Sequence, residues 1–198
     1  MNLINRAKNM ILTPKTEWEA VAAEKADVNQ IIINYVVPFT IAGAVAAFIG
    51  YGLIGFGFGL FRFVGTSWGI YYALLLIIRY VAGMLITAFV ADALAPSFGS
   101  EKNFGKSLQL VVYGSTPAFV AGLFSILPFL SAIIIGAGSI YSIYLWYLGL
   151  GPVKKTPEDK KIVYLIVTFA ILLVVYFVIG AILRIILLPI FGLGFGLY

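Results

Sequence analysis

The segment LGLGPVKKTPEDKKIVY, from Leu148 to Tyr164, is a compact charged stretch between two long apolar ones. Its centre, residues 154–161, carries four lysines and two acidic residues. The apolar stretch on each side is long enough to cross a bilayer core about 30 Å thick. A lysine-rich loop between two membrane spans is retained in the cytoplasm. The segment therefore predicts a helical hairpin and fixes the side of the membrane on which its loop lies.

Composition assigns the chain to the integral membrane proteins. Of its 198 residues, 62% are hydrophobic and 11% are charged, and the mean hydropathy is +1.06. A soluble domain is about half apolar and about a quarter charged. The chain has no cysteine and no histidine, which removes thiol nucleophiles, the commonest general base and the commonest metal ligand. We therefore expect no enzyme activity, no metal and no cofactor.

Five transmembrane helices are predicted, which gives an all-α, polytopic fold. The expected spans form one transmembrane domain over residues 31–198, and they cover residues 31–54, 69–91, 108–127, 129–150 and 162–188. Residues 108–150 contain no charge, and as a single helix they would measure about 65 Å, twice the membrane core. The chain must fold back within this stretch, and Pro128 is the expected turn.

The distribution of basic residues orients these spans. A cytoplasmic N-terminus in the cell membrane leaves Arg62 as the basic residue of an outside loop and places ten on the inside: Arg6, Lys8, Lys15, Lys25, Lys102, Lys106, Lys154, Lys155, Lys160 and Lys161. This excess follows the positive-inside rule, and five spans then put the C-terminus outside. The basic residues do not gather on one face, so the net charge of +5 is explained by membrane topology and by contact with anionic lipid. No nucleic-acid partner is expected.

Residues 1–30 are expected to form a cytoplasmic, interfacial segment of two short helices. An apolar face repeats at helical spacing through residues 3–11, as in helices that lie on a membrane surface. Thr13 and Pro14 have the residue types of a helix cap and a first helical position. Trp18 in the second helix has two interpretations, an anchor at headgroup depth or a docking surface for a cytoplasmic partner. The anchor is favoured, because tryptophan is enriched at membrane interfaces.

The charged segment itself predicts a helix start and an interaction surface. Thr156 and Pro157 precede two acids, which favours a helix capped by Thr156 with negative charge at the positive end of its dipole. The expected cytoplasmic interaction surface combines Trp18 with the lysines of this segment: Lys154, Lys155, Lys160 and Lys161.

A polar site within the membrane is the second candidate. An arginine deep in a span, such as Arg79, costs about 2.5–3.5 kcal/mol unless it is paired or faces water. It either lines a cavity that holds an anionic headgroup or solute, or it binds helix carbonyls and tyrosine hydroxyls as structural support. A proline in a span either creates a binding site at a broken helix or kinks the helix for packing. The candidate site comprises Arg79, Tyr113, Ser115, Thr116 and Pro117. Asp92 is about 20 Å further along the helix from Arg79 and is expected to mark the cytoplasmic edge.

Glycines are concentrated around the end of the first span. Residues 50–55 match G-x-G-x-x-G, but the strand, helix and acidic residue of a dinucleotide site are missing. The spacing of Gly55 with Gly59, and of Gly65 with Gly69, favours close helix approach instead. Residues 56–61 and 191–198 repeat phenylalanine and glycine, and they are expected to form an aromatic patch on the outside face.

The order of these motifs resembles the Yip family, five-span membrane proteins named for interacting with Ypt/Rab GTPases. The resemblance covers nearly the whole chain and rests on Pro14 and Trp18, on YGSTP at 113–117, on ILP at 126–128, and on YSIY, LGLG and KKTPEDK between 141 and 160. It implies five helices, a cytoplasmic N-terminus, self-association or partnership with other membrane proteins, and GTPase binding. Eukaryotic members carry a long polar N-terminal region, whereas residues 1–30 alone precede the first span here, which is similar to a prokaryotic member.

The expected function is therefore non-enzymatic. We expect a membrane-organising or trafficking-type adaptor that acts through helix packing and through contacts with lipids or proteins. The alternative is a transporter or channel for a small solute or ion, with its site near Arg79 and Pro117.

Overall fold

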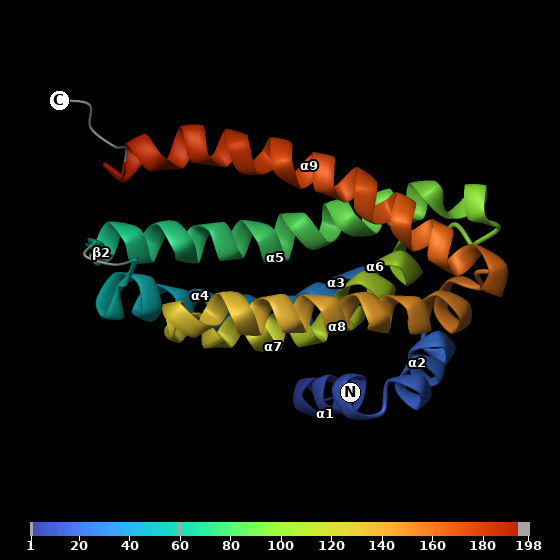
Figure 1. Ribbon diagram of the computed structural model, residues 1–198. Helices are drawn as coiled ribbons and strands as arrows, with labels where there is room; N and C mark the ends of the chain where they lie inside the picture. Colours follow the sequence, from blue (N-terminus) through green and yellow to red (C-terminus); the bar gives the residue numbers. More distant parts are fainter. Residues whose placement is uncertain (1, 59–60, 194–198) are drawn as a thin grey trace.

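The computed structural model describes residues 2–58 and 61–193, and in it the chain passes back and forth along a helical bundle (Figure 1). Four stretches are long and apolar enough to be continuous spans, and a bent helix pair has the combined length and apolar composition of a fifth. In chain order the five passes are α3 (Val28–Ile31) with η1 (Ile32–Val36), α4 (Val37–Ala47) and η2 (Phe48–Ile54); α5 (Thr66–Leu94) with η3 (Ala95–Phe98); the bent pair α6 (Phe104–Gly114) and α7 (Thr116–Gly122) with η4 (Leu123–Ile126); α8 (Pro128–Lys154); and η5 (Glu158–Lys160) with α9 (Lys161–Ile190).

These elements confirm the all-α, polytopic prediction. Each expected span overlaps one of the five passes, and α8 begins at Pro128, where the turn was predicted. η1 and η2 are π-helical, so the first pass is wider in its helical turns than an ideal α-helix on both sides of Pro38. The third pass bends by 46° between α6 and α7.

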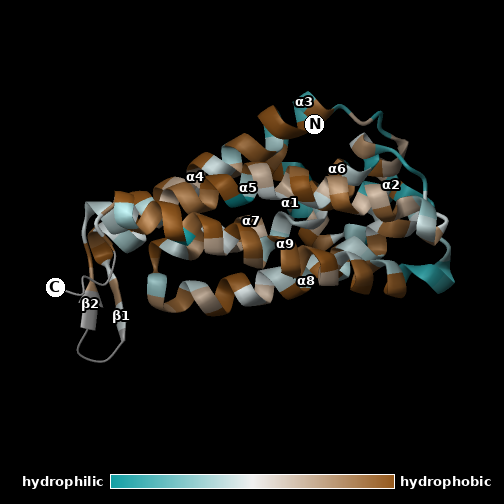
Figure 2. Ribbon diagram, turned by 90° about the horizontal axis from the view of Figure 1, so that it is seen from above, coloured by the Kyte–Doolittle hydropathy of each residue, from teal (hydrophilic) through white to brown (hydrophobic). Residues whose placement is uncertain are grey.

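The two ends of the bundle differ in chemistry. Hydrophilic residues gather mainly at one end (Figure 2), which we call the charged end and which holds residues 24–30, 99–106 and 154–161. At the other end the antiparallel strands β1 (Phe56–Phe58) and β2 (Phe61–Phe63) form a short hairpin with Phe56 opposite Phe63. The rings of Phe56, Phe63 and Trp68 pack together there, with centroids 5.3–5.5 Å apart. Part of the expected aromatic patch is thus an ordered hairpin, whereas residues 194–198 lie outside the described residues.

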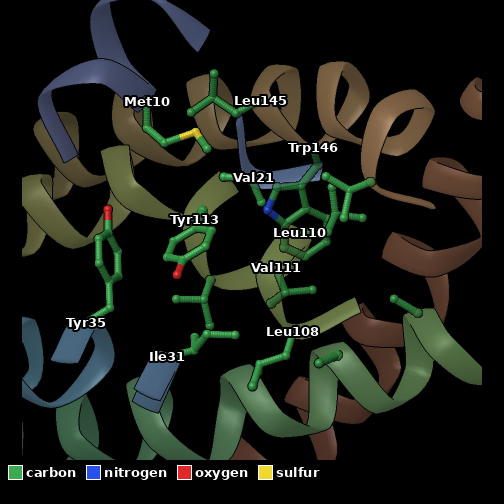
Figure 3. Close-up of a cluster of buried hydrophobic side chains, with 14 of the residues drawn as sticks. Met10, Val21, Ile31, Tyr35, Leu108, Leu110, Val111, Tyr113, Leu145 and Trp146 are labelled. Atoms are coloured by element: carbon green, nitrogen blue, oxygen red, sulfur yellow. The ribbon is translucent and has the colours of Figure 1, made fainter. Parts of the chain in front are cut away.

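The N-terminal helices α1 (Leu3–Leu12) and α2 (Pro14–Ala23) pack into the bundle. Met10, Trp18 and Val21 are all fully buried, and Figure 3 shows Met10 and Val21 in one cluster with side chains of the membrane helices. The indole of Trp18 packs against α8 at Gly149, where an added Cβ would lie 2.8 Å from the ring. The prediction that Trp18 is an interfacial anchor or an exposed docking residue is therefore wrong, because the missing side chain of Gly149 makes room for it in the core.

The cap at the start of α2 also differs from the prediction. The Thr13 hydroxyl makes no capping bond to α2 and donates instead to the carbonyl of Asn9 in α1. Pro14 does occupy the first turn. The other end of α2 is held by Lys106, whose Nζ donates to the carbonyls of Ala22 (2.9 Å) and Glu24 (2.8 Å). A cation at the end of a helix satisfies carbonyls that have no partner within the helix, so α6 secures the N-terminal helices.

Close approach through glycine occurs at Gly52 and Gly69. A Cβ on Gly69 would lie 2.9 Å from the Cα of Gly52, so the backbones of the first and second passes touch where neither residue has a side chain. Gly55 has φ +84° in the turn into β1, a conformation that glycine adopts without strain. Gly65 has no neighbour within 4 Å that an added Cβ would meet, and Gly59 lies outside the described residues.

Candidate functional site

Two adjoining cavities lie between α5, α7, α8 and α9. Their volumes are about 420 and about 530 Å³, and both are lined by Arg79, Ala118 and Tyr176. The larger one also reaches Ser115 at the break between α6 and α7. We refer to the two together as the Arg79 cavity. Its walls are mostly apolar side chains, so the guanidinium is the main charge that a bound molecule would meet.

Arg79 is exposed and carries an unpaired charge. Among residues 2–58 and 61–193 it makes no hydrogen bond and no ion pair. It lies near the middle of α5, about 20 Å from Thr66 and about 22 Å from Leu94 along the helix axis. An unpaired charge at that depth costs about 2.5–3.5 kcal/mol. The site therefore presents a cation that requires an anion or water as its partner.

The hydroxyl groups around Arg79 are largely occupied. The hydroxyls of Thr87 and Tyr176 lie 2.6 Å apart, and Tyr176 also donates to the carbonyl of Gly83 at 2.8 Å. Ser139 and Ser142 donate to carbonyls of their own helix, α8. The hydroxyl of Ser115 is different, because it has no hydrogen-bond partner in the described part of the chain. Arg79 and Ser115 are thus free to bind a ligand. The hydroxyls of Tyr72 and Ser125 and the indole N–H of Trp146, in the same walls, also have no hydrogen-bond partner in the described part of the chain.

The break in the third pass has a local chemical cause. Pro117 has no N–H, so the carbonyl of Tyr113, four residues earlier, loses its helical partner. The hydroxyl of Thr116 donates to that carbonyl at 2.5 Å and lies 2.7 Å from the hydroxyl of Tyr35. Gly138 of α8 packs against Pro117, where a Cβ would lie 2.7 Å from the proline carbonyl. Thr116 and Pro117 thus shape the bend and hold it against α8.

The predicted polar site is consequently split. Arg79 and Ser115 share a cavity, but Tyr113 lines a different pocket on the other side of α6, together with Arg6 and Tyr35. The guanidinium of Arg6 lies over the Tyr113 ring, 4.9 Å from its centroid. The prediction of one site is wrong in this respect, because residues 113 and 115 project from the helix in different directions just before the 46° bend.

The lysines of the charged segment divide into buried and exposed ones. Lys154 is fully buried, with its Nζ 3.1 Å from Asp92 and 2.6 Å from the hydroxyl of Ser107. Lys161 is buried as well and lies 5.6 Å from the ring of Tyr147. These two residues and Trp18 cannot form an exposed interaction surface, which corrects the sequence prediction. A buried ammonium needs a paired charge, and Asp92 at the end of α5 supplies it for Lys154.

Lys155 and Lys160 are exposed, as the predicted surface required. Lys155 forms an ion pair of 2.9 Å with Glu101, and its ammonium holds the pKa of Glu101 below the usual value. The hydroxyl of Thr156 does not cap the last helix, because it lies 2.8 Å from that of Ser100. The last pass begins instead with the 3-10 turn η5. These contacts join the loop before α9 to the loop before α6.

Arg6 is a buried charge that the sequence did not indicate. It has 3% of its surface exposed and pairs with Glu17 at 2.9 Å and with Glu24. Arg6 lies outside the apolar face of residues 3–11, and no local pattern distinguishes a solvated arginine from one that meets two glutamates further along the chain. In the described residues, no group of three or more acidic side chains is arranged to hold a metal ion.

Comparison with known proteins places the whole architecture in one family. A model described as the Yip1 domain matches residues 8–182. The chain is 24% identical over 162 residues to the inner membrane protein YohC of Escherichia coli K12, a match that covers 80% of this chain and 83% of that protein. The same protein of Escherichia coli O6:H1 matches equally. No solved structure matches the chain.

Proposed function

The chain belongs to the family of the Yip1 domain, and we propose that it is a non-enzymatic, membrane-organising protein that holds an anionic lipid group at Arg79. The observation that carries this proposal is the unpaired guanidinium in the middle of α5, inside a cavity between membrane helices. An exposed charge in an apolar groove stabilises a bound anion more strongly than a charge in water does. The lipid phosphate is the anion that membranes supply at the highest concentration.

The broader adaptor role and its partners belong to the same proposal. A protein that binds a particular lipid between its helices influences the bilayer around it without catalysing a reaction. The exposed apolar surface of α9, which includes Leu173, Phe177 and Ile185, suits contact with lipid or with other membrane helices. We expect self-association in the cell membrane with residues 154–161 in the cytoplasm, and lysine retention supports that orientation.

A transporter is the second candidate, and one observation favours it. Arg79 and Ser115 meet in one cavity at a broken helix, and broken helices are where many transporters bind solutes. In that case the anion at Arg79 would be a small solute that crosses the membrane. The two candidates thus share a binding group and differ in whether the bound anion moves.

Arg79→Gln is expected to lower the number of co-purified anionic lipids about tenfold in native mass spectrometry, since one lost charge-assisted contact is worth about 1.5–3 kcal/mol. Arg184→Gln is the matched control. Arg184 is also an exposed arginine in an apolar helix, but it lies near the end of α9, where it reaches the headgroup region. The control should retain lipid as the wild type does.

The same variants separate the two candidates. If wild-type liposomes show no anion flux above protein-free liposomes and Arg79→Gln loses its lipid, the membrane-organising function is supported. Anion flux that Arg79→Gln abolishes and Arg184→Gln preserves would establish the transporter instead. Unchanged lipid retention together with unchanged flux in Arg79→Gln would refute both functions.

A further inference from the structure

A second pocket, at the charged end, is separate from the Arg79 cavity. It measures about 280 Å³ and lies between α1, α6 and the stretch from residue 24 to residue 35. In contrast to the Arg79 cavity, its walls are rich in polar and charged groups, including Glu24, Lys25, Asp27 and Gln109. No group proposed to act at Arg79 lines it, so whatever it binds is independent of the function proposed above.

Gln109 marks this pocket as a binding site. The residue is 2% exposed, and its Oε1 accepts no hydrogen bond from the part of the chain that the structure describes. A buried acceptor without a partner costs about 1–3 kcal/mol, and native proteins keep few of them. Because Gln109 forms part of the pocket wall, a ligand that donates an N–H or O–H from within the pocket would satisfy it.

The wall holds further acceptors beside its two cations, Arg6 and Lys25. Glu24 uses its Oε1 for Arg6, and Asp27 uses its Oδ1 for the N–H of Gln30. The second oxygen of each carboxylate has no partner among residues 2–58 and 61–193. Tyr113 stands beside Tyr35 in the same wall, with its hydroxyl directed toward the side on which Ile31 lies (Figure 3). Arg6 is already paired with Glu17 and Glu24, so the free carboxylate oxygens and the amide oxygen remain to recognise a further cation with several N–H donors.

The position of the pocket indicates where that cation comes from. The first span begins at Val28, so Asp27 and Gln30 lie where the helix enters the bilayer, at the depth of lipid headgroups. Lys25, in the same wall, is exposed and suits a phosphate beside the amine. We propose that this pocket binds a protonated primary amine, and that the amine is the ethanolamine headgroup of a membrane phospholipid.

Ethanolamine and choline headgroups provide a sharp test, because they differ only at the nitrogen. The primary ammonium of ethanolamine donates three hydrogen bonds, whereas the quaternary nitrogen of choline donates none and leaves Gln109 unpaired. In native mass spectrometry from nanodiscs with equal amounts of the two lipids, the full chain should retain phosphatidylethanolamine about tenfold over phosphatidylcholine. Soluble phosphoethanolamine, added in a second arm, reports whether the free amine binds without its lipid tails.

Gln109→Leu is expected to abolish the preference for ethanolamine, so that the variant retains the two lipids in about equal amounts. The variant should fold, because it removes an unpaired buried acceptor and keeps the size of the side chain. Asp27→Asn keeps the capping oxygen and removes a charge, so it should weaken the preference several-fold. Asn29→Leu is the control, since Asn29 is an exposed amide on α3 that does not line the pocket.

Three results would separate the interpretations. Preference for ethanolamine lipid that depends on Gln109 supports the proposal, and competition by soluble phosphoethanolamine at equal concentration would identify a free amine as the ligand of the same site. Equal retention of the two lipids by the wild type, or a preference that survives Gln109→Leu, would overturn it. Arg79→Gln should leave the ethanolamine preference unchanged, so failure of the proposed function and failure of this site are distinguishable.

Discussion

Lys154→Met is expected to lower the free energy of unfolding by about 3–5 kcal/mol, because it removes one partner of a buried ion pair. The Nζ of Lys154 lies 3.1 Å from Asp92 and 2.6 Å from Ser107, and the lysine has no exposed surface. The methionine fills the space of the lysine stem but leaves the Asp92 carboxylate without its cation. Unfolding in mixed detergent micelles, followed by far-UV circular dichroism, measures the change.

Two further variants show that the charge is the cause. Lys154→Met combined with Asp92→Asn should recover a large part of the loss, since an asparagine oxygen still accepts from the backbone N–H of Asn103 and from Ser107, and no unpaired charge remains. Lys155→Met, at the neighbouring exposed lysine that pairs with Glu101, should leave the unfolding midpoint nearly unchanged. Equal losses for Lys154→Met and Lys155→Met would mean that the buried pair does not form in the membrane.

The ion pair also shows what the sequence predicts and what it does not. Hydropathy and the positive-inside rule predict the spans and the loop that contains Lys154, because both depend only on the local balance between apolar and charged residues. The partner of Lys154 lies 62 residues away at the end of another helix. A charged residue at the end of a span is normally solvated, so only the tertiary packing of α5, α6 and α8 distinguishes Lys154 from Lys155.

The burial of Trp18 and of Arg6 could not be predicted from the sequence for the same reason. Amphipathic periodicity predicts the two N-terminal helices, and both are present. Periodicity alone does not distinguish a helix that lies on lipid from one that packs on protein, because both contacts are apolar. Gly149 is the deciding residue, and its role in accommodating Trp18 depends on two segments that the sequence separates by 131 positions. Arg79 was identifiable from sequence, because the free energy of burying its charge in the membrane depends on its depth in one span. The unpaired amide of Gln109, in contrast, becomes evident only from the residues that surround it in the fold.

Gly50→Ala is expected to lower the free energy of unfolding by about 3 kcal/mol, at the upper end of the usual cost of overpacking. Gly50 lies in η2, and a Cβ there would come within 1.9 Å of the carbonyl oxygen of Ser125 in η4. The clashing atom belongs to the backbone, so no rotation of a side chain relieves it, and the first and third passes must separate. Thermal unfolding in nanodiscs measures the loss.

Gly136→Ala provides the matched control for the same substitution. Gly136 lies inside α8 and has no neighbour within 4 Å of an added Cβ. The alanine there removes the flexibility of a helical glycine, and it should raise the free energy of unfolding by about 0.5–1 kcal/mol. The two substitutions are chemically identical and are expected to act in opposite directions, because one position touches a carbonyl and the other faces open space. If Gly50→Ala were as stable as Gly136→Ala, then η2 would not contact η4 in the bilayer, and the π-helical end of the first pass would need another explanation.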